Sequence, residues 1–249
     1  MNVLDDRKLQ NFGIVQFAHN RRNLMQLRLL RRAPPALACD DLIAVRVPGI
    51  LAKDQRLNDA LLADRIRKLG PLSIPESCSL ASQLCSALTA LHGKGIVHRD
   101  VKPGNVYLLK ALGVTIKLID FGMSKSFLDD TDAITEAGRV IGTPSYMAPE
   151  QLLGEAPDPR WDVYGVGLVM WEALVGVPYV KSHKRIEQTF RAVLEREPEA
   201  PSRLRGKIPP YLDDLVMRAS SADPKQRYDD CAQMKKACDE ALKRVVKEL

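Results

Sequence analysis

Three short polar segments contain the residues whose types and spacing could perform chemistry. They are residues 98–106 (HRDVKPGNV), 120–122 (DFG) and 142–150 (GTPSYMAPE). The first segment brings an acid, Asp100, together with Lys102 and Asn105. An acid can accept a hydroxyl proton and a lysine can offset the charge of a phosphate, whereas carboxylate and amide oxygens bind Mg²⁺. With Asp120 as a further carboxylate, these groups suit phosphoryl transfer.

The elements that must position these segments follow from hydrophobic spacing and turn residues. A helix that Ser73 or Ser77 can cap is predicted to run to about His92, because leucines recur along it and glycines follow. Two short strands, at 106–110 and 115–119, are predicted on either side of a Leu-Gly pair. The acid, lysine and amide therefore lie in the connection between a helix and a strand pair.

Other segments supply the body around this connection. Residues 162–175 are apolar nearly all round, which predicts a helix that is buried on every side. Residues 123–141 are polar and rich in hydroxyl groups, and we interpret them as a mobile loop. The remaining predicted elements, all based on apolar residues at regular spacing or in short runs, are helices at 14–30, 183–197, 209–220 and 229–248 and a strand at 42–47.

The bulk composition limits the class of protein. A chain of 249 residues suits one large domain or two closely packed lobes, and 45% hydrophobic with 27% charged residues is typical of a soluble globular protein. The five cysteines form no Cys-x-x-Cys pair, and two pairs, 78/85 and 231/238, share a helix face by spacing, so buried thiols are expected rather than a zinc site. No signal peptide or membrane-spanning run is visible, which favours a cytoplasmic protein without a membrane partner.

The net charge of +6 is concentrated at the front of the chain. Residues 1–39 contain seven lysines or arginines and two aspartates. Such a basic end can attract nucleic acid, but the chain has only 5% aromatic residues and therefore offers a poor surface for stacking bases. A solvated helix face is the preferred interpretation, and no nucleic-acid partner is expected.

The order and spacing of the three polar segments resemble the catalytic half of a eukaryotic-like (Hanks-type) serine/threonine protein kinase. The similarity runs from about Gly70 to Ala241. It implies an α+β, protein-kinase-like two-lobed fold, with a mostly helical large lobe at residues 53–249 and an incomplete small lobe at residues 1–52. It also implies a transferase that uses ATP and Mg²⁺ and acts on a serine or threonine of a protein substrate.

The resemblance further implies a role for each polar residue of the site. Asp100 would orient the substrate hydroxyl and take its proton, and Lys102 would offset charge on the transferring phosphate. Asn105 and Asp120 would bind the metal, and Lys102 would share cofactor binding with these two. Phe121 would pack beneath Asp120.

Residues near the catalytic acid would shape and regulate the site. His98 is given a structural role, and Gly122 would let the backbone bend. In kinases resembling this chain, the arginine equivalent to Arg99 pairs with a phosphorylated residue of the following loop. Thr135 is the first candidate for that phosphorylation and Thr131 is another. The alternative is that the hydroxyl groups only keep the loop soluble.

Four more residues are assigned by the same resemblance. Thr143 would contact both the catalytic acid and the lysine and would form part of the floor for the substrate. Glu150 would form a buried ion pair with Arg227, far downstream. Asp162 would hold the backbone of the catalytic loop at the start of the buried helix. Glu150, Arg227 and Asp162 thus have structural roles.

The front of the sequence departs from the family pattern. Gly13 is the only glycine before Gly49, so no Gly-x-Gly-x-x-Gly loop is present, and no acidic residue lies between Arg7 and Cys39. The lysine that binds ATP phosphates and the helix glutamate that anchors it are therefore missing. Removal of one preorganised charge typically costs ~10²–10³ in turnover. The two interpretations are a start that lies within the true coding region and a degenerate kinase.

These features leave competing functions open. One is an active serine/threonine protein kinase. Another is a pseudokinase or scaffold, or an inactive fragment, whose large lobe binds a partner kinase or a second copy in a dimer. A third is nucleic-acid binding, for which charge is the only argument.

Overall fold

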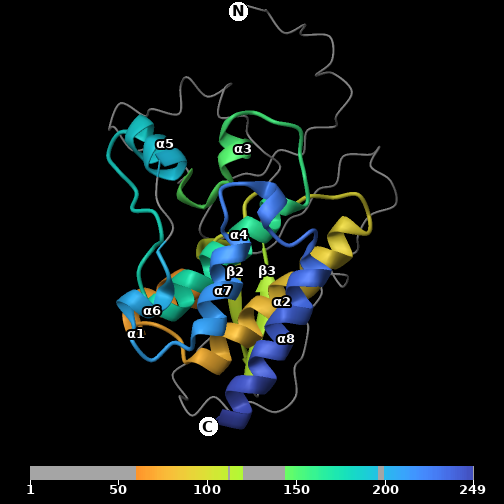
Figure 1. Cartoon of the computed structure of the whole chain (residues 1–249), viewed down its shortest axis with the longest axis vertical. Coiled ribbons are helices and arrows are strands. Elements are labelled where there is room, and N and C mark those ends of the chain that lie inside the picture. Colours follow the sequence, from red (N-terminus) through yellow and green to blue (C-terminus); the bar gives the residue numbers. More distant parts are fainter. Residues whose placement is uncertain (1–59, 112, 120–143, 196–198, 249) are drawn as a thin grey trace, which may run out of the picture. The chain divides into compact units, whose positions relative to one another are not determined.

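The computed structural model describes residues 60–111, 113–119, 144–195 and 199–248 (Figure 1). Several sequence-based predictions lie outside these described residues: the helix at 14–30, the strand at 42–47, the division between residues 52 and 53, the loop at 123–141, residues 120–122, Thr131, Thr135 and Thr143. Among the described residues, no helix combines the length and the apolar composition that crossing a bilayer requires.

Helix α2 (Ile74–His92) leads into the segment with the candidate catalytic residues. A capping box fixes its start, because Ser73 Oγ accepts the backbone N–H of Glu76 at 3.4 Å and the Glu76 carboxylate accepts the N–H of Ser73 at 2.8 Å. Gly93 follows its last residue. The helix predicted to run from this serine to about His92 is confirmed.

Helix α4 (Arg160–Val175) runs through the interior. Every residue from Trp161 to Leu174 is buried, which confirms the helix that was predicted to be buried on every side. Gly176 ends it with a φ of 91°, and a Cβ at this position would lie 2.9 Å from Cδ of Pro71. The backbone conformation and the close packing both require glycine here.

Strands from before and after the catalytic segment form a small antiparallel sheet. Its strands β1 (Ala60–Leu61), β2 (Val106–Ala111) and β3 (Gly113–Leu118) are in that order in space. Val106 pairs with Leu118 and Leu108 with Ile116, and all four side chains are buried. The two predicted strands are confirmed, although β3 begins two residues before the predicted start at residue 115.

The remaining helices are mostly in the second half of the chain. They are α1 (Leu62–Leu69), α3 (Pro149–Leu152), α5 (Ile186–Glu195), α6 (Pro201–Leu204), α7 (Pro210–Ala219) and α8 (Cys231–Glu248), with short 3-10 turns η3 (Pro103–Asn105), η4 (Pro144–Tyr146) and η5 (Pro224–Gln226). The helices predicted at 183–197, 209–220 and 229–248 correspond to α5, α7 and α8 and are confirmed.

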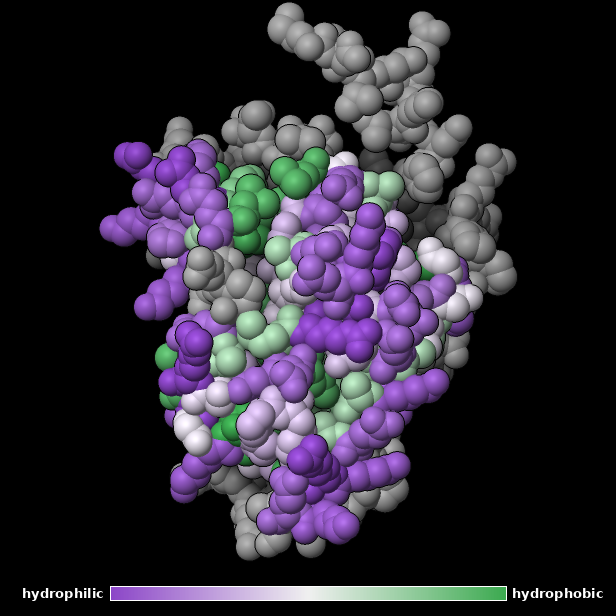
Figure 2. Space-filling view, in the orientation of Figure 1, coloured by the Kyte–Doolittle hydropathy of each residue, from purple (hydrophilic) through white to green (hydrophobic). Residues whose placement is uncertain are grey.

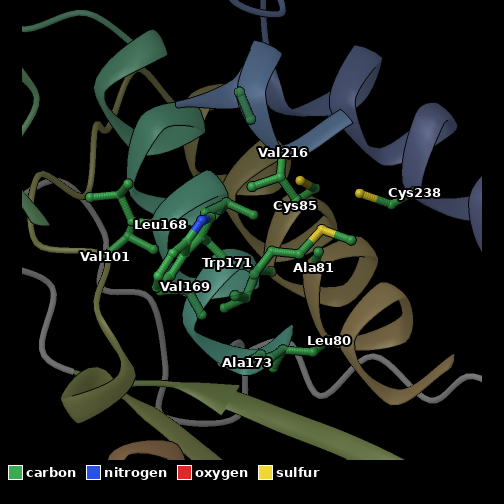
Figure 3. Close-up of a cluster of buried hydrophobic side chains, with 14 of the residues drawn as sticks. Leu80, Ala81, Cys85, Val101, Leu168, Val169, Trp171, Ala173, Val216 and Cys238 are labelled. Carbon is green, nitrogen blue, oxygen red and sulfur yellow. The ribbon is translucent and has the colours of Figure 1, made fainter. Parts of the chain in front are cut away.

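The hydrophobic core lies between α2, α4, α7 and α8 (Figure 3). Trp171 and Leu168 of α4, Leu80 of α2 and Val216 of α7 are buried members of this core. Val101 of the catalytic segment belongs to the same core, so its packing against the helices fixes the segment in position.

Polar side chains cover most of the face shown in Figure 2. Hydrophobic side chains gather between the positions of α3 and α5. Leu153, next to α3, is 67% exposed and Leu194 of α5 is also exposed. Most other large apolar residues that the structure describes are at least partly buried.

Candidate active site

The buried carboxylate of Asp162 holds the backbone of the catalytic segment. Its two oxygens accept the backbone N–H groups of His98 and Arg99, each at 2.8 Å. Arg99 has a φ of 69°, a left-handed conformation that costs a residue with a side chain about 1–3 kcal/mol. The two hydrogen bonds to Asp162 offset that cost, and they fix the direction in which the next residue, Asp100, leaves the turn.

His92 approaches the same carboxylate from the end of α2. Its Nε2 lies 2.7 Å from Oδ2 of Asp162. Burial by itself lowers the pKa of His92, but the hydrogen bond to Asp162 and the neighbouring Cys231 outweigh burial and raise the pKa to about 9. Near neutral pH the imidazole is therefore protonated, and it places a positive charge beside the Asp162 carboxylate.

The side chains of Lys102 and Asn105 both donate hydrogen bonds to one carboxylate oxygen of Asp100. Lys102 Nζ donates to Oδ2 of Asp100 at 2.7 Å, and Asn105 Nδ2 donates to the same oxygen at 2.8 Å. Asn105 Nδ2 also donates to the backbone oxygen of Asp100 at 2.8 Å. The Asp100 and Lys102 side chains are 27% and 25% exposed, so both can be reached from solvent. The site thus joins an accessible acid to an accessible cation.

Asn105 also connects this cluster to the strands. It is buried in the turn η3, and its backbone oxygen accepts the N–H of Ile119 at 2.9 Å. Ile119 is the last described residue before Asp120. This described segment therefore ends beside Asn105, and Asp120, Phe121 and Gly122 lie outside the described residues.

His98 is buried under the turn. Its Nδ1 accepts the backbone N–H of Asp100 at 3.3 Å. Gln151 of α3 donates from Nε2 to the backbone oxygen of Arg99 at 2.9 Å. These contacts fix the residues on both sides of the left-handed position, so the segment is held by α3 and α4 together.

Glu150 and Arg227 form a buried ion pair, with Nη1 to Oε1 at 2.6 Å and Nη2 to Oε2 at 2.8 Å. The pair connects the start of α3 to the turn before α8. Because the adjacent Gln151 of α3 is bonded to the backbone of the catalytic turn, this ion pair supports the site from one side. Thr143, which precedes η4, lies outside the described residues.

A partly buried polar pair was not predicted from the sequence. Tyr146 of η4 donates from its hydroxyl to Glu172 of α4. Burial, together with the charge of Glu172, raises the pKa of Tyr146 well above its ordinary value, and burial raises the pKa of Glu172. The signal that could have revealed the pair is a glutamate within an otherwise apolar helix, since such a residue needs a polar partner.

Gly165 was also missed as a residue that positions the site. A Cβ at Gly165 would lie 2.8 Å from Cβ and 3.0 Å from the backbone oxygen of Val101. Val101 stands between Asp100 and Lys102. The absence of a side chain on α4 at this position therefore sets how closely the catalytic segment packs on the helix.

We expect Gly165→Ala to lower the free energy of unfolding by about 1–3 kcal/mol, because an extra methyl group overpacks this contact. Urea unfolding followed by circular dichroism measures the change. Gly206→Ala is the matched control, since a Cβ at Gly206 meets no atom within 4 Å. Equal effects of the two substitutions would contradict a special contact at Gly165.

A polar catalytic turn fixed to a buried central helix, followed by a β-hairpin, defines this part of the chain as the large lobe of a protein kinase fold. Residues 52–241 match the family model described as "Protein kinase domain", and the chain belongs to this family. The family and the mostly helical α+β fold expected from the sequence are thereby confirmed.

Several kinases are similar to the chain. It is 35% identical over 174 residues to serine/threonine-protein kinase PknB of Mycolicibacterium smegmatis, and the match covers 70% of this chain and 27% of PknB. It is 37% identical over 175 residues to serine/threonine-protein kinase Pkn1 of Myxococcus xanthus, with 69% of this chain and 25% of Pkn1 covered. The chain thus spans about a quarter of the length of these curated relatives.

A solved structure supports the same fold. The PknI kinase domain of Mycobacterium tuberculosis, in the crystal structure of a point mutant, superposes with a TM-score of 0.56 and 25% sequence identity. The match covers 74% of this chain and 62% of that kinase domain. The likeness therefore extends over most of this chain and over more than half of the kinase domain.

Proposed function

We propose that the chain is a serine/threonine protein kinase of the cytoplasm, which transfers the γ-phosphate of ATP to a hydroxyl group of a protein. One observation carries the proposal: a single carboxylate oxygen of Asp100 accepts hydrogen bonds from both Lys102 and Asn105. This arrangement unites the acid and the cation that phosphoryl transfer needs. Family membership and similarity to named serine/threonine-protein kinases add support.

In this proposal the Asp100 carboxylate orients the substrate hydroxyl and accepts its proton. Its exposed fraction of 27% leaves room for a hydroxyl to approach. Lys102 keeps its ammonium within 2.7 Å of this carboxylate, so the same charge that steadies the acid can also offset charge on the phosphate oxygens. The left-handed Arg99 and the buried Asp162 hold this geometry in place before substrate binds.

The residues present also fit a magnesium ion. Both hydrogen bonds from the Asn105 side chain use its nitrogen, which turns the amide oxygen away from Asp100 and leaves it suited to a hard cation. Asp120 follows Ile119, whose N–H is bonded to the Asn105 backbone. Asn105 and Asp120 would hold Mg²⁺, with Phe121 and Gly122 in supporting roles. When bound, the ion neutralises charge on the ATP phosphates.

We further propose that Arg99 receives a phosphorylated loop residue, with Thr135 as the first candidate and Thr131 as the second. The Nε atom of Arg99 is buried and meets no hydrogen-bond partner in the part of the chain that the structure describes. A phosphate would satisfy such a group. Thr143 would contact Asp100 and Lys102 and form the floor for the substrate.

The experiment that tests the function is transfer of label from γ-labelled ATP to a generic protein substrate. Label on serine or threonine that requires Mg²⁺ supports the proposal. No transfer by the folded chain, at any substrate concentration, would overturn it. Phosphoamino-acid analysis distinguishes serine and threonine from other acceptors.

A pseudokinase that serves as a scaffold for a partner kinase or a second copy is the second candidate. It is favoured by the lack of any acidic residue between Arg7 and Cys39. A purified chain that forms a stable complex with a kinase but transfers no label would support this candidate instead.

Magnesium-dependent binding of ATP gives a further prediction. At ATP·Mg²⁺ concentrations near 100 times the dissociation constant, binding adds about 2.7 kcal/mol to the free energy of unfolding. We expect Asn105→Ala to lose the part of this gain that depends on Mg²⁺. Thermal unfolding with ATP, with and without Mg²⁺, measures it. The control is Gln188→Ala, which removes an amide from the exposed face of α5. Equal magnesium dependence in both variants would contradict the role of Asn105.

A further inference from the structure

Four buried thiols face one another between α2 and α8. Cys78 and Cys85 are on α2, whereas Cys231 and Cys238 are on α8, and all four side chains are fully buried and free of disulfide bonds. The two helices lie side by side along their length (Figure 1). Figure 3 shows the Cys238 sulfur of α8 directed toward Cys85 of α2. The mechanism proposed above uses none of these thiols.

Cys85 is the centre of this cluster. The thiols of Cys231 and Cys238 both lie next to its own. Burial, followed by these two thiols, raises the pKa of Cys85 well above its ordinary value. Cys85 therefore remains a neutral thiol next to two possible partners for a disulfide bond.

Cys231 differs from the other thiols in its surroundings. It is the first residue of α8, where the helix N-terminus favours a negative charge, and it lies beside the His92 ring. The hydrogen bond from Cys85 and then the nearby His92 outweigh burial and lower the pKa of Cys231. Nδ1 of His92 is buried and has no hydrogen-bond partner among the described residues. The Cys231 thiol, which lies beside the ring, is therefore the acceptor available to this N–H.

His92 is at the same time bonded through Nε2 to Asp162 at 2.7 Å. Cys231, His92 and Asp162 therefore stand in the order of thiol, imidazole and carboxylate. In this order the carboxylate favours a protonated imidazole, and a protonated imidazole favours a thiolate. The arrangement marks Cys231 as the most nucleophilic of the four thiols, with Cys85 within reach of it.

We propose that Cys231 and Cys85 form a redox modification site, in which a peroxide converts them to a disulfide bond between α8 and α2. The Cys231 sulfur attacks one peroxide oxygen, the O–O bond breaks, and a sulfenic acid and one water form. The Cys85 sulfur then attacks the sulfenic sulfur, so that the S–S bond forms and the hydroxyl leaves as a second water. The two thiols lose two electrons and two protons, and hydrogen peroxide is reduced to two waters.

This inference does not depend on the proposed kinase activity, because it concerns thiols that face the core rather than the phosphate site. Cys231 and Cys238 both lie next to Cys85, and only one of them is expected to be oxidised first. Cys238 contacts Cys85 as well, but it lies within α8, away from its N-terminus, and has no imidazole beside it among the described contacts. The first oxidation is therefore assigned to Cys231 and not to Cys238.

Peptide mapping of the full chain tests the site. Cys39 lies outside the described residues, so the experiments use a Cys39→Ser background. The folded protein is treated with hydrogen peroxide, denatured, alkylated with N-ethylmaleimide and digested. We expect two thiols per chain to become resistant to alkylation, one cross-linked peptide pair that contains residues 85 and 231, and full recovery of both thiols with dithiothreitol.

Variants separate the two steps. In Cys85→Ser, dimedone should label Cys231 as a sulfenic acid and no cross-link should form. In Cys231→Ser the cross-link to residue 85 should be lost, whereas Cys78→Ser and Cys238→Ser should keep it. A disulfide to residue 238 that forms equally well without Cys231 would overturn the proposal. So would four thiols that all remain open to alkylation after peroxide treatment of the folded parent chain, a result that does not depend on the folding of any variant.

Discussion

Asp100→Asn is expected to lower the rate of phosphate transfer by about 10²–10⁴-fold, the usual contribution of a positioned proton acceptor. Oδ2 of Asp100 accepts hydrogen bonds from Lys102 and from Asn105. An amide at this position keeps the shape of the carboxylate but loses its charge and its capacity to take a proton. The effect should appear in kcat, with a smaller change in KM, because the carboxylate acts most strongly when the hydroxyl loses its proton.

A stability measurement and a control variant accompany this prediction. Urea unfolding should show that the variant folds, since Asp100 is accessible and its loss opens no cavity. Asp64→Asn is the matched control, because Asp64 makes an exposed ion pair with Arg67 of the same helix, α1, and not with Lys102 or Asn105. A variant at position 100 that transfers label as fast as the parent chain would refute the assignment of Asp100 as the acid.

A related prediction concerns Lys102→Met, alone and combined with Asp100→Asn. Lys102→Met alone should cost about 10²–10³-fold, as for loss of one preorganised charge. Because Lys102 and Asp100 are in direct contact at 2.7 Å, the double variant should be little worse than Asp100→Asn alone. Losses that multiply in full would mean that the two residues act independently, contrary to the geometry.

The parts of the fold that were predictable depend on local chemistry. Ser73 marks the start of α2 by side-chain capping and Gly93 follows its end because glycine has a low helix propensity, and both effects act within a few residues of the sequence. The uninterrupted apolar residues of α4 predict burial on every side for the same reason. Asp100, Lys102 and Asn105 are near in sequence, so a single turn is enough to bring their side chains together.

Other contacts depend on which faces meet, and local pattern does not determine that. The spacing of seven residues placed Cys85 and Cys78 on one helix face, but only the packing of α2 on α8 brings Cys85 to Cys231. The close approach of Gly165 to Val101 has the same origin. Strand β1 has two residues, too few to show an alternating pattern, and it exists because β2 provides an edge for pairing.

Contacts across long separations were accessible through the resemblance to a family and not through the residues alone. Asp162 and His98 are 64 residues apart, and nothing in the local sequence of either one indicates the hydrogen bond between them. Glu150 and Arg227 are separated by 77 residues. In both cases a polar side chain in a buried segment signals only that some partner must exist.

Removal of either member of the Glu150–Arg227 pair is expected to lower the free energy of unfolding by about 3–5 kcal/mol, because an unpaired charge would be left in the interior. Arg227 is 2% exposed. Its guanidinium makes five hydrogen bonds: two to Glu150, and one each to the backbone oxygens of Arg160, Ser221 and Ala222. All five N–H donors of the side chain are therefore satisfied.

Arg227→Lys should lose most of this stability, although it keeps the positive charge. A lysine has three donors at one point and cannot reproduce the planar fork that binds both Glu150 oxygens, at 2.6 and 2.8 Å. It would also lose the contact with the Tyr164 ring, whose centroid lies 4.8 Å from the guanidinium carbon. Stability close to that of the parent chain would show that charge alone is sufficient.

A double-mutant cycle separates the interaction from the cost of leaving a partner unpaired. Glu150→Gln and Arg227→Met each leave one buried group without its partner, so the double variant should be less destabilised than the sum of the two single variants. Arg67→Met, which removes an exposed partner that is 73% accessible on its side chain, should cost about 0–1 kcal/mol. Chemical denaturation of the parent chain, the two single variants and the double variant gives the coupling free energy. Strict additivity of the two buried substitutions would mean that Arg227 is held by its backbone acceptors and that Glu150 contributes independently of it.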